Sequence, residues 1–314
     1  ALAPSTTPDN FTSLDLQMES VIADIRDRER LNAVIDKYQP DLIFHLAAQP
    51  IVLESYSNPV ETFEVNVQGT VNLLEVCRHT ESVTGVVVIT TDKCYENNEQ
   101  GLAFKESDPM GGNDPYSASK ACAEIICKSY SRSFYELDGK GLCSCRSGNV
   151  IGGGDWAADR LVPDLMRAAA SGKSAIIRNP GSVRPWLHVL EPLSGYLMLG
   201  AELLAANNAV SGAWNFGPGS EVEKSVAELA VLSKDCWSGL RIEDGSDARA
   251  PHEAKMLKLD SAKALNAGWQ PVWDFEQSVS HTVNWYRDFY LESINQSRKD
   301  LYNYCKDAER KGIK

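Results

Sequence analysis

The sequence lacks any long apolar segment. No apolar run approaches the roughly 20 residues that cross a bilayer, and there is no charged-then-apolar secretion signal. Positive charge is also scarce, because 31 Lys and Arg face 43 Asp and Glu, which gives a net charge of −12. We therefore expect no nucleic-acid and no membrane partner, while a local cationic pocket for a small phosphorylated ligand stays compatible with this charge.

Cysteine pairs of the metal-binding type are missing too. None of the eight cysteines forms a Cys-x-x-Cys. Cys143 and Cys145 alternate onto one face of a predicted strand, which is poor geometry for a disulfide. We expect reduced, buried thiols in a cytoplasmic protein without a metal site.

The first half of the chain alternates between strand and helix patterns. The predicted strands cover 41–48, 83–90 and 141–147, and the predicted helices cover 27–38, a segment that opens at Pro59, and 115–137. This alternation predicts an α/β fold with a doubly wound parallel sheet over residues 1–150. Three finer expectations concern a loop at 1–14, a short strand at Val21-Ile22, and a buried helical stripe made of Phe63, Val67, Val71 and Leu74.

The second half, 151–314, predicts a smaller α+β lobe whose pieces interleave with the sheet. Gly152-Gly153-Gly154 predicts a turn at the junction of the lobes. Helices are predicted at 160–171, 190–207, 225–235, 260–267 and 275–292, and strands at 174–178 and 213–216. The polar segment 293–314 fits either a final helix or a frayed tail.

Two short stretches form the candidate site. Thr91-Asp92-Lys93 follows the apolar run 86–89, so its polar groups stand at the carboxyl end of a buried strand, where open α/β sheets place ligands. Tyr116 and Lys120 are four residues apart and share one face of a predicted helix. A nearby ammonium favours the phenolate form of a tyrosine, so this pair is a plausible base.

The spacing of that pair is weak evidence by itself. With 11 Tyr in 314 residues, chance supplies about 0.6 Tyr-x-x-x-Lys spacings. The chain in fact holds a second copy, Tyr302 and Lys306, in a polar segment that follows no strand tip. We interpret this second copy as a solvated helix face, and the context of the first copy as the mark of an enzyme site.

A glycine-rich phosphate turn is absent. Dinucleotide folds normally open with a strand, such a turn, a helix and a second strand, and here the only dense glycine cluster, 152–154, comes too late. We expect the chain to start after that unit, about 40 residues into the fold. Either it is a fragment or the unit has been lost.

Several motifs in order resemble the extended short-chain dehydrogenase/reductase family. They are Asp24-Ile25-Arg26-Asp27, His45-Leu46-Ala47-Ala48-Gln49, Asn66-Val67-Gln68-Gly69-Thr70, the Tyr116/Lys120 pair, the stretch 146–156, Arg184-Pro185-Trp186-Leu187-His188-Val189, the stretch 214–218 and Pro251-His252-Glu253-Ala254. The resemblance implies NAD as the cofactor. Its contacts would be Asp24, Ile25, Leu46, Ala47, Ala48, Gln49, Asn66, Tyr116 and Lys120. Without the glycine-rich turn, we expect this chain to bind NAD weakly.

Within that family, the sugar-nucleotide 4,6-dehydratases carry Thr-Asp-acid/base at the strand tip. Thr91-Asp92-Lys93 is similar to this triplet. A lysine at the position of Lys93 resembles the family members that act on CDP-glucose. The resemblance implies oxidation at C4 of the sugar, elimination of water across C5 and C6, and return of the hydride to C6. Tyr116 would be the C4 base, Thr91 would bind the same hydroxyl, and Lys120 would lower the pKa of Tyr116.

The roles of the next two residues carry physical conditions. Asp92 serves as the acid only if burial raises its pKa, and Lys93 serves as the C5 base or enolate stabiliser only if desolvated or placed beside another cation. Arg184 would bind the substrate pyrophosphate, since a guanidinium meets phosphate oxygens bidentately. Asn149 would bind the nucleotide or the sugar.

Two other functions stay open at this point. A nucleotide-sugar 4-epimerase needs the tyrosine and lysine but no acid/base pair at 92–93. A truncated, non-catalytic relative would explain the missing turn. The resemblance also implies a homo-dimer or tetramer formed through helices 59–79 and 115–137, whose second faces include Ile126, Tyr130 and Phe134.

Overall fold

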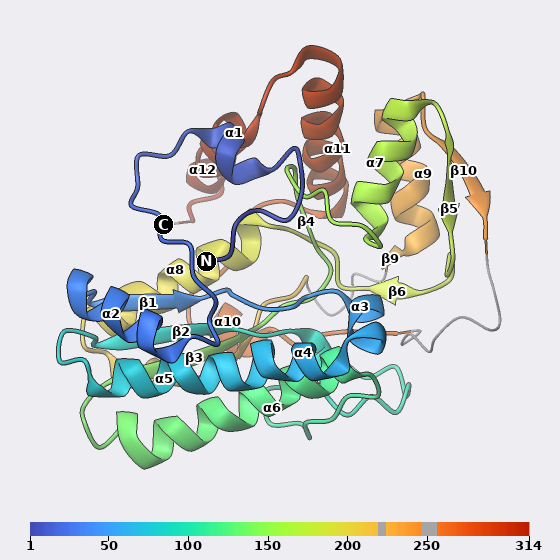
Figure 1. The fold of residues 1–314 in the computed structure, drawn as a ribbon. Coiled ribbons are helices and arrows are strands. Elements are labelled where there is room, and N and C mark those ends of the chain that lie inside the picture. Colours follow the sequence, from blue (N-terminus) through green and yellow to red (C-terminus); the bar gives the residue numbers. More distant parts are fainter. Residues whose placement is uncertain (219–223, 246–255, 314) are drawn as a thin grey trace.

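A four-stranded parallel sheet forms the centre of the larger lobe (Figure 1). The protein is described by a computed structural model that covers residues 1–218, 224–245 and 256–313. The strand order is β1-β2-β3-β8, with bounds Leu42–His45, Gly85–Ile89, Gly141–Arg146 and Gly212–Asn215. Helices cover both faces, so the predicted doubly wound sheet is confirmed.

Successive side chains of β2 point to opposite faces of the sheet, and each face is covered by a layer of helices. Val86 and Val88 join a core beneath α2, α5 and α6 (Arg28–Tyr38, Gly69–His79 and Pro115–Tyr130). Val87 points the other way, into a core with α8 and α10 (Leu190–Leu204 and Ala262–Asn266). A strand buried on both faces needs an unbroken apolar sequence, which explains the run 86–89.

The second half of the chain completes this sheet. The strand predicted at 213–216 is β8, which pairs in parallel with β3 so that Cys145 lies opposite Trp214. Helix α8, predicted at 190–207, covers the face of the sheet opposite α5 and α6 (Figure 1). The expected interleaving is therefore present, and it brings β8 beside the candidate site.

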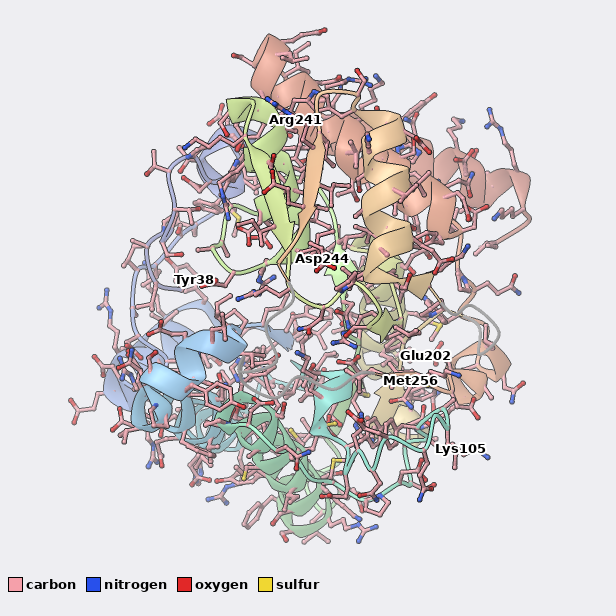
Figure 2. The ribbon with its side chains drawn as sticks, turned by 90° about the vertical axis from the view of Figure 1, so that its right-hand side faces the viewer. Tyr38, Lys105, Glu202, Arg241, Asp244 and Met256 are labelled. Carbon is pink, nitrogen blue, oxygen red and sulfur yellow. The ribbon has the colours of Figure 1, made fainter. Side chains whose placement is uncertain are left out.

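The smaller lobe packs α7, α9 and α11 around a core rich in tryptophan and leucine. Their bounds are Leu161–Ser171, Val226–Cys236 and Phe275–Glu292. Short strand pairs flank them: β5 with β10 (Ser174–Ile177 and Arg241–Asp244), β4 with β7 (Val150–Ile151 and Leu187–His188), and β6 with β9 (Val183–Arg184 and Lys224–Ser225). Figure 2 shows β10, labelled at Arg241 and Asp244, on the outer side of this lobe.

The C-terminal segment forms a helix, α12 (Ser297–Arg310), rather than a frayed tail. The Tyr304 hydroxyl donates to Glu191 Oε2 over 2.8 Å. Glu191 is fully buried and also accepts the backbone N–H groups of Val272 and Trp273. This carboxylate ties α12 and the 272–273 loop to the start of α8.

Two local expectations are wrong, and several short elements were not predicted. Residues 1–14 are not all loop, because Asp9 caps a short helix, α1 (Asn10–Leu14), by accepting the N–H of Thr12 at 2.7 Å. Val21-Ile22 forms no strand; it pairs with no strand in the described residues. A helix not predicted, α3 (Val52–Ser57), precedes Pro59, and short 3₁₀ turns are present at η2 and η4 (Asp92–Cys94 and Asn208–Val210).

The buried stripe predicted for the helix that opens at Pro59 is confirmed at Leu74, which is fully buried in the core, but not at Phe63. The helix runs through α4 (Pro59–Phe63), a π-helical turn η1 (Glu64–Gln68) and α5. Thr62, Asn66 and Thr70 are buried, whereas Phe63 is 37% exposed. A π turn adds a residue to the helical repeat and rotates the faces that follow, which a pattern of 3.6 residues per turn does not anticipate.

Helix α6 continues into a second π-helical turn, η3 (Ser131–Tyr135). Here Ile126, Tyr130 and Phe134, expected on an outer face, are half-buried against the chain's own core.

Across the described residues, no helix is both long and apolar enough to cross a bilayer.

Candidate active site

The start of α6 positions the tyrosine and the lysine. Asp114 is the N-cap, and its carboxylate accepts the N–H of Ser117 at 2.9 Å and the Ser117 hydroxyl at 2.5 Å. Pro115 occupies the first helical turn, where its missing N–H has no cost. Tyr116 and Lys120 follow one turn apart, 8% and 7% exposed, on the face that meets the sheet.

The end of β2 meets this face. Lys120 Nζ donates to the carbonyl of Ile89 over 3.1 Å, and the Thr91 side chain lies close enough to the Tyr116 hydroxyl to lower the pKa of Tyr116. Thr91 caps the turn η2 and lies 3.1 Å, Oγ1 to Oδ1, from Asp92. The structure thus brings Thr91, Asp92, Tyr116 and Lys120 together.

Burial, rather than the neighbouring amine, has the largest effect on the pKa of Tyr116. It raises the pKa of Tyr116 to about 12; the Thr91 side chain lowers that pKa and the charge of Asp92 raises it further. Burial likewise lowers the pKa of Lys120 to about 8. The expectation that Lys120 lowers the tyrosine pKa is therefore outweighed here by desolvation, and Tyr116 is a neutral phenol near neutral pH.

Asp92 meets the condition set above for a proton donor, which is that burial raises its pKa. Its side chain is 1% exposed, and Oδ2 is buried without a hydrogen-bond partner. Burial raises the pKa of Asp92, and the positive charges of Lys93 and Arg184 oppose this only in part. Gly148 lies directly against the carboxyl group, because a Cβ at that position would stand 1.9 Å from Oδ2. A buried carboxyl of this kind favours its protonated form and can donate a proton.

The predicted substrate residues also lie near this carboxyl. Asn149 follows Gly148 in the left-handed region at φ 49°, and its buried Nδ2 has no hydrogen-bond partner. Arg184 is 3% exposed, donates to the carbonyl of Val183 over 3.0 Å and acts electrostatically on Asp92. The motif at 251–254 lies outside the described residues.

The predicted cofactor residues divide into two groups. Leu46, 56% exposed, and Ala47 present open surface after β1, next to the half-buried Ala48. The polar members are already engaged within the protein. Asn66 accepts the N–H of Gln49 at 2.8 Å and donates to Ser119 Oγ at 2.9 Å.

Two more predicted polar cofactor residues are engaged in the same way. The Gln49 amide donates to Thr62 Oγ1 over 2.8 Å. The Asp24 carboxylate is bidentate to Arg26, with a shortest contact of 2.7 Å, and this lowers the pKa of Asp24. The adjacent Ile25 packs against Gly69, where a Cβ would come within 2.6 Å. These side chains therefore shape the edge of the site instead of presenting unused polar groups.

Sequence reasoning missed two residues of this site. Arg160 is one of the charges that lower the pKa of Tyr116, and it pairs with Asp155 at 3.1 Å. Gly148 gives Asp92 its space. Neither had a local signal, since an arginine before a helix and a glycine after a strand are both common.

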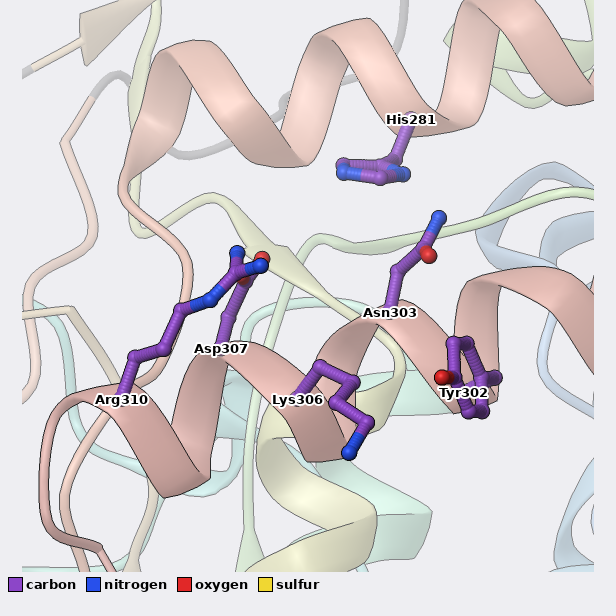
Figure 3. A pocket seen from close by; sticks show the side chains of 6 residues that line it. All are labelled: His281, Tyr302, Asn303, Lys306, Asp307 and Arg310. Atoms are coloured by element: carbon purple, nitrogen blue, oxygen red, sulfur yellow. The ribbon is translucent and has the colours of Figure 1, made fainter.

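A cavity of about 450 Å³ lies elsewhere, between α11 and α12 (Figure 3). It is lined by His281, Tyr302, Asn303, Lys306, Asp307 and Arg310. The cations beside it are paired, Lys306 with Glu309 at 3.2 Å and Arg310 with Asp307 at 2.9 Å. It contains the second Tyr-x-x-x-Lys copy and none of the residues gathered at the strand tip.

The sequence model of the GDP-mannose 4,6-dehydratase family matches residues 5–282. The chain belongs to this family. This membership confirms the resemblance inferred from the motifs, and it covers both the sheet and the smaller lobe.

The individual proteins to which this chain is similar are consistent with one another. A CDP-glucose 4,6-dehydratase from Salmonella typhimurium is 45% identical over 99% of the chain and 89% of that enzyme. A solved dTDP-glucose 4,6-dehydratase from Streptomyces venezuelae, with NAD and TYD bound, has a TM-score of 0.73 at 27% identity, covering 88% of this chain and 81% of that one. A UDP-glucose 4-epimerase from Thermus thermophilus, in complex with NAD, reaches 0.74 at 25% identity, covering 84% and 83%.

Proposed function

We propose that this chain converts CDP-glucose into CDP-4-keto-6-deoxyglucose and water. The observation that carries the proposal is the buried Asp92, whose raised pKa makes it a proton donor beside Thr91 and Tyr116. Oxidation at C4 alone needs no such acid, whereas departure of the C6 hydroxyl does. The choice of CDP follows the 45% identical relative and Lys93.

The residues at the carboxyl edge of the sheet fit NAD as the cofactor. Leu46 and Ala47 offer open surface there, and the Lys120 ammonium has three donors, of which the Ile89 carbonyl takes one. We assign Ala48, Gln49, Asn66 and the Asp24-Ile25 segment to the border of the same site. Bound NAD⁺ supplies a cationic ring, a hydride acceptor for C4 and the hydride that returns to C6.

Tyr116 then acts on the C4 hydroxyl. As a phenolate it accepts the hydroxyl proton, while Thr91, whose side chain lies near the Tyr116 hydroxyl, orients the same oxygen. Because the pKa of Tyr116 is about 12 before ligands bind, added positive charge is needed to form the phenolate near neutral pH. The Lys120 ammonium and Arg160 remain as cations on the protein side.

Asp92 and Lys93 act on the elimination. The protonated Asp92 gives its proton to the departing C6 hydroxyl, which leaves as water. Lys93, next to it in the turn η2, stabilises the enolate as a cation or, in its neutral form, removes the C5 proton. Arg184, whose charge acts on this carboxyl, is assigned to the pyrophosphate, and Asn149, which follows Gly148, is assigned to the sugar or the nucleotide.

The experiment is to supply the purified chain with excess NAD and, in parallel, the CDP-, dTDP-, GDP- and UDP-linked glucoses. We expect fastest turnover of CDP-glucose to a 4-keto-6-deoxy product, seen as an absorbance in alkali. A galactose-type product would instead identify an epimerase. Absence of both turnover and NAD released on denaturation would identify a non-catalytic relative, and tight NAD binding would contradict the expected weak affinity.

We also propose a homo-oligomer, a dimer or a tetramer, formed through the outer faces of the helices 59–79 and 115–137, which comprise α4, η1 and α5, and α6 and η3. Val60 is 70% exposed and Ile125 57% exposed on these helices, and apolar side chains in such positions favour pairing. Light scattering on the purified chain tests this, and a monomer mass at micromolar concentration would contradict it.

We further propose a cytoplasmic location. All eight cysteines are free in the structure, and most are buried, as is typical of reducing compartments. Localisation of a tagged protein in its host is the direct measurement.

A further inference from the structure

Helix α6 carries a third polar side chain in register with the catalytic pair. Tyr116, Lys120 and Glu124 follow one another at intervals of four residues and therefore share one face. Each meets a different residue at the end of β2. The Thr91 side chain acts on the Tyr116 hydroxyl, Lys120 Nζ donates to the Ile89 carbonyl, and Glu124 Oε1 accepts the hydroxyl of Thr90. The helix thus makes polar contacts with three consecutive residues, 89–91, at and just after the end of β2.

Glu124 is the most buried and the most strongly bonded of the three. Its side chain is 3% exposed, and Oε2 accepts Ser144 Oγ at 2.8 Å and Arg146 Nη2 at 2.6 Å. Arg146 also donates through Nη1 to the Tyr95 hydroxyl at 2.7 Å. The Tyr95 hydroxyl donates in turn to Asn215 at 2.6 Å, so one polar network joins α6, β2, β3 and β8.

Stability alone is a weak reason for this network. A buried ion pair loses much of its attraction to desolvation, and apolar residues of similar size often replace such a pair without loss of stability. What apolar packing does not supply is direction. Thr90 lies between the residue that anchors Lys120 and the residue that meets Tyr116, so a carboxylate bound to Thr90 sets how far α6 slides along β2.

We propose that Glu124 is a positioning residue, which fixes α6 against the end of β2 so that Tyr116 and Lys120 meet Thr91 and the Ile89 carbonyl. It touches neither substrate nor cofactor and acts through Thr90. The inference rests on the proposed function for its kinetic consequence only, because the contact itself is present without ligands.

The charge of Glu124 also reaches Lys120. The titratable groups that act on this amine are Glu124 and Cys127 on α6 and Cys94 after β2, and the amine in turn acts on His45 at the end of β1. Glu124 favours the ammonium form and raises the pKa of Lys120, against burial, which lowers it to about 8. Loss of this carboxylate therefore shifts the amine pKa further down.

The test compares Glu124→Gln and Thr90→Val with two matched controls. Thr90→Ser keeps the hydroxyl, and Glu228→Gln changes the exposed carboxylate that caps α9. We expect both test variants to lower kcat about 10- to 100-fold with KM within about threefold, and both controls to match the wild type. The high-pH limb of kcat moves to lower pH in Glu124→Gln.

A second readout needs no turnover. Titration of isotope-labelled lysine by NMR follows Lys120 directly, and Glu124→Gln lowers its midpoint below that of the wild type. If this shift occurs while no glucose nucleotide is turned over by the wild type, the positioning role stands and the proposed function fails. If folded Glu124→Gln and Thr90→Val keep the wild-type kcat, pH profile and lysine midpoint, Glu124 is structural only and the inference is overturned.

Discussion

The chain holds two Tyr-x-x-x-Lys copies that differ in everything except spacing. Tyr116 and Lys120 begin a buried helix and face a strand end, whereas Tyr302 is 63% exposed on α12 and Lys306 pairs with Glu309 at 3.2 Å. A cavity lies beside the second copy, between α11 and α12 (Figure 3). The comparison teaches that an interval of four residues only places two side chains on one face, and that the surroundings decide their chemistry.

Desolvation explains the difference in charge state. Burial lowers the pKa of Lys120 to about 8, while the hydrogen bond with Glu309 raises the pKa of the fully exposed Lys306 above its ordinary value. Near neutral pH, the first lysine is a cation held at a free-energy cost, and the second is an ordinary solvated cation.

The largest expected difference between the copies is at the tyrosines. We expect Tyr116→Phe to reduce kcat/KM about 1,000-fold, since it removes the base for the C4 hydroxyl. Tyr302→Phe is the matched control and should stay within about twofold. Steady-state kinetics on CDP-glucose measures both, and equal losses would end the distinction between the copies.

Replacement of the lysines should separate activity from stability. We expect Lys120→Met to cost about 100-fold in kcat. The lowered pKa of Lys120 means that the folded state binds this proton less well, so stability is reduced below pH 8 and recovers as pH rises from about 8 to 10.5.

Lys120→Met removes that penalty of about 3 kcal/mol and loses one hydrogen bond, so its free energy of unfolding near neutral pH should rise by about 2 kcal/mol. Lys306→Met should change it by less than about 0.5 kcal/mol. Urea denaturation at neutral pH and at pH above 10.5 checks the sign; a destabilised Lys120→Met at neutral pH would contradict the assignment of a costly buried cation.

The carboxyl groups of Asp92, near the first Tyr-x-x-x-Lys copy, and Asp307, beside the second copy, offer the next contrast. We expect Asp92→Asn to slow the overall reaction about 100-fold, because it removes the proton donor for the C6 hydroxyl while C4 oxidation continues. Reduced cofactor should then accumulate and be visible by absorbance. Asp307→Asn, at a carboxyl whose pKa is lowered by Trp273 and Arg310, should show wild-type rates.

The smallest effect concerns the space around Asp92. We expect Gly148→Ala to lower kcat about 10-fold, because the added methyl group displaces the carboxyl that it would otherwise touch. Gly181→Ala is the control, since its Cβ meets nothing within 4 Å. A wild-type rate for Gly148→Ala would show that the position of Asp92 is not critical.

Much of the fold was predictable because its signals are local. The helices at 161–171 and 275–292 coincide with predicted ranges, since capping residues and apolar periodicity act within one or two turns. The prediction of Phe63 as core was wrong because the π turn at 64–68 separates it from Leu74, so that the two side chains no longer share one helical face. Likewise, Val21-Ile22 did not become a strand, because strand formation depends on a partner elsewhere in the chain.

The residues of the site divide in the same way into those that local sequence signals predict and those that only the fold brings together. Tyr116, Lys120 and Thr91-Asp92-Lys93 could be named from spacing and from the strand that precedes them. The partners of Asn66 and Asp24, and the roles of Arg160 and Gly148, could not, because they depend on which side chains face one another after folding.

The sequence by itself determined most of the long helices, the buried strands and the shared face of Tyr116 and Lys120, because these follow from backbone geometry over a few residues. Only the tertiary structure decided the charge states at the site. Burial of Asp92, Tyr116 and Lys120 shifts each pKa against the charged form, and burial arises from packing between residues far apart in the chain.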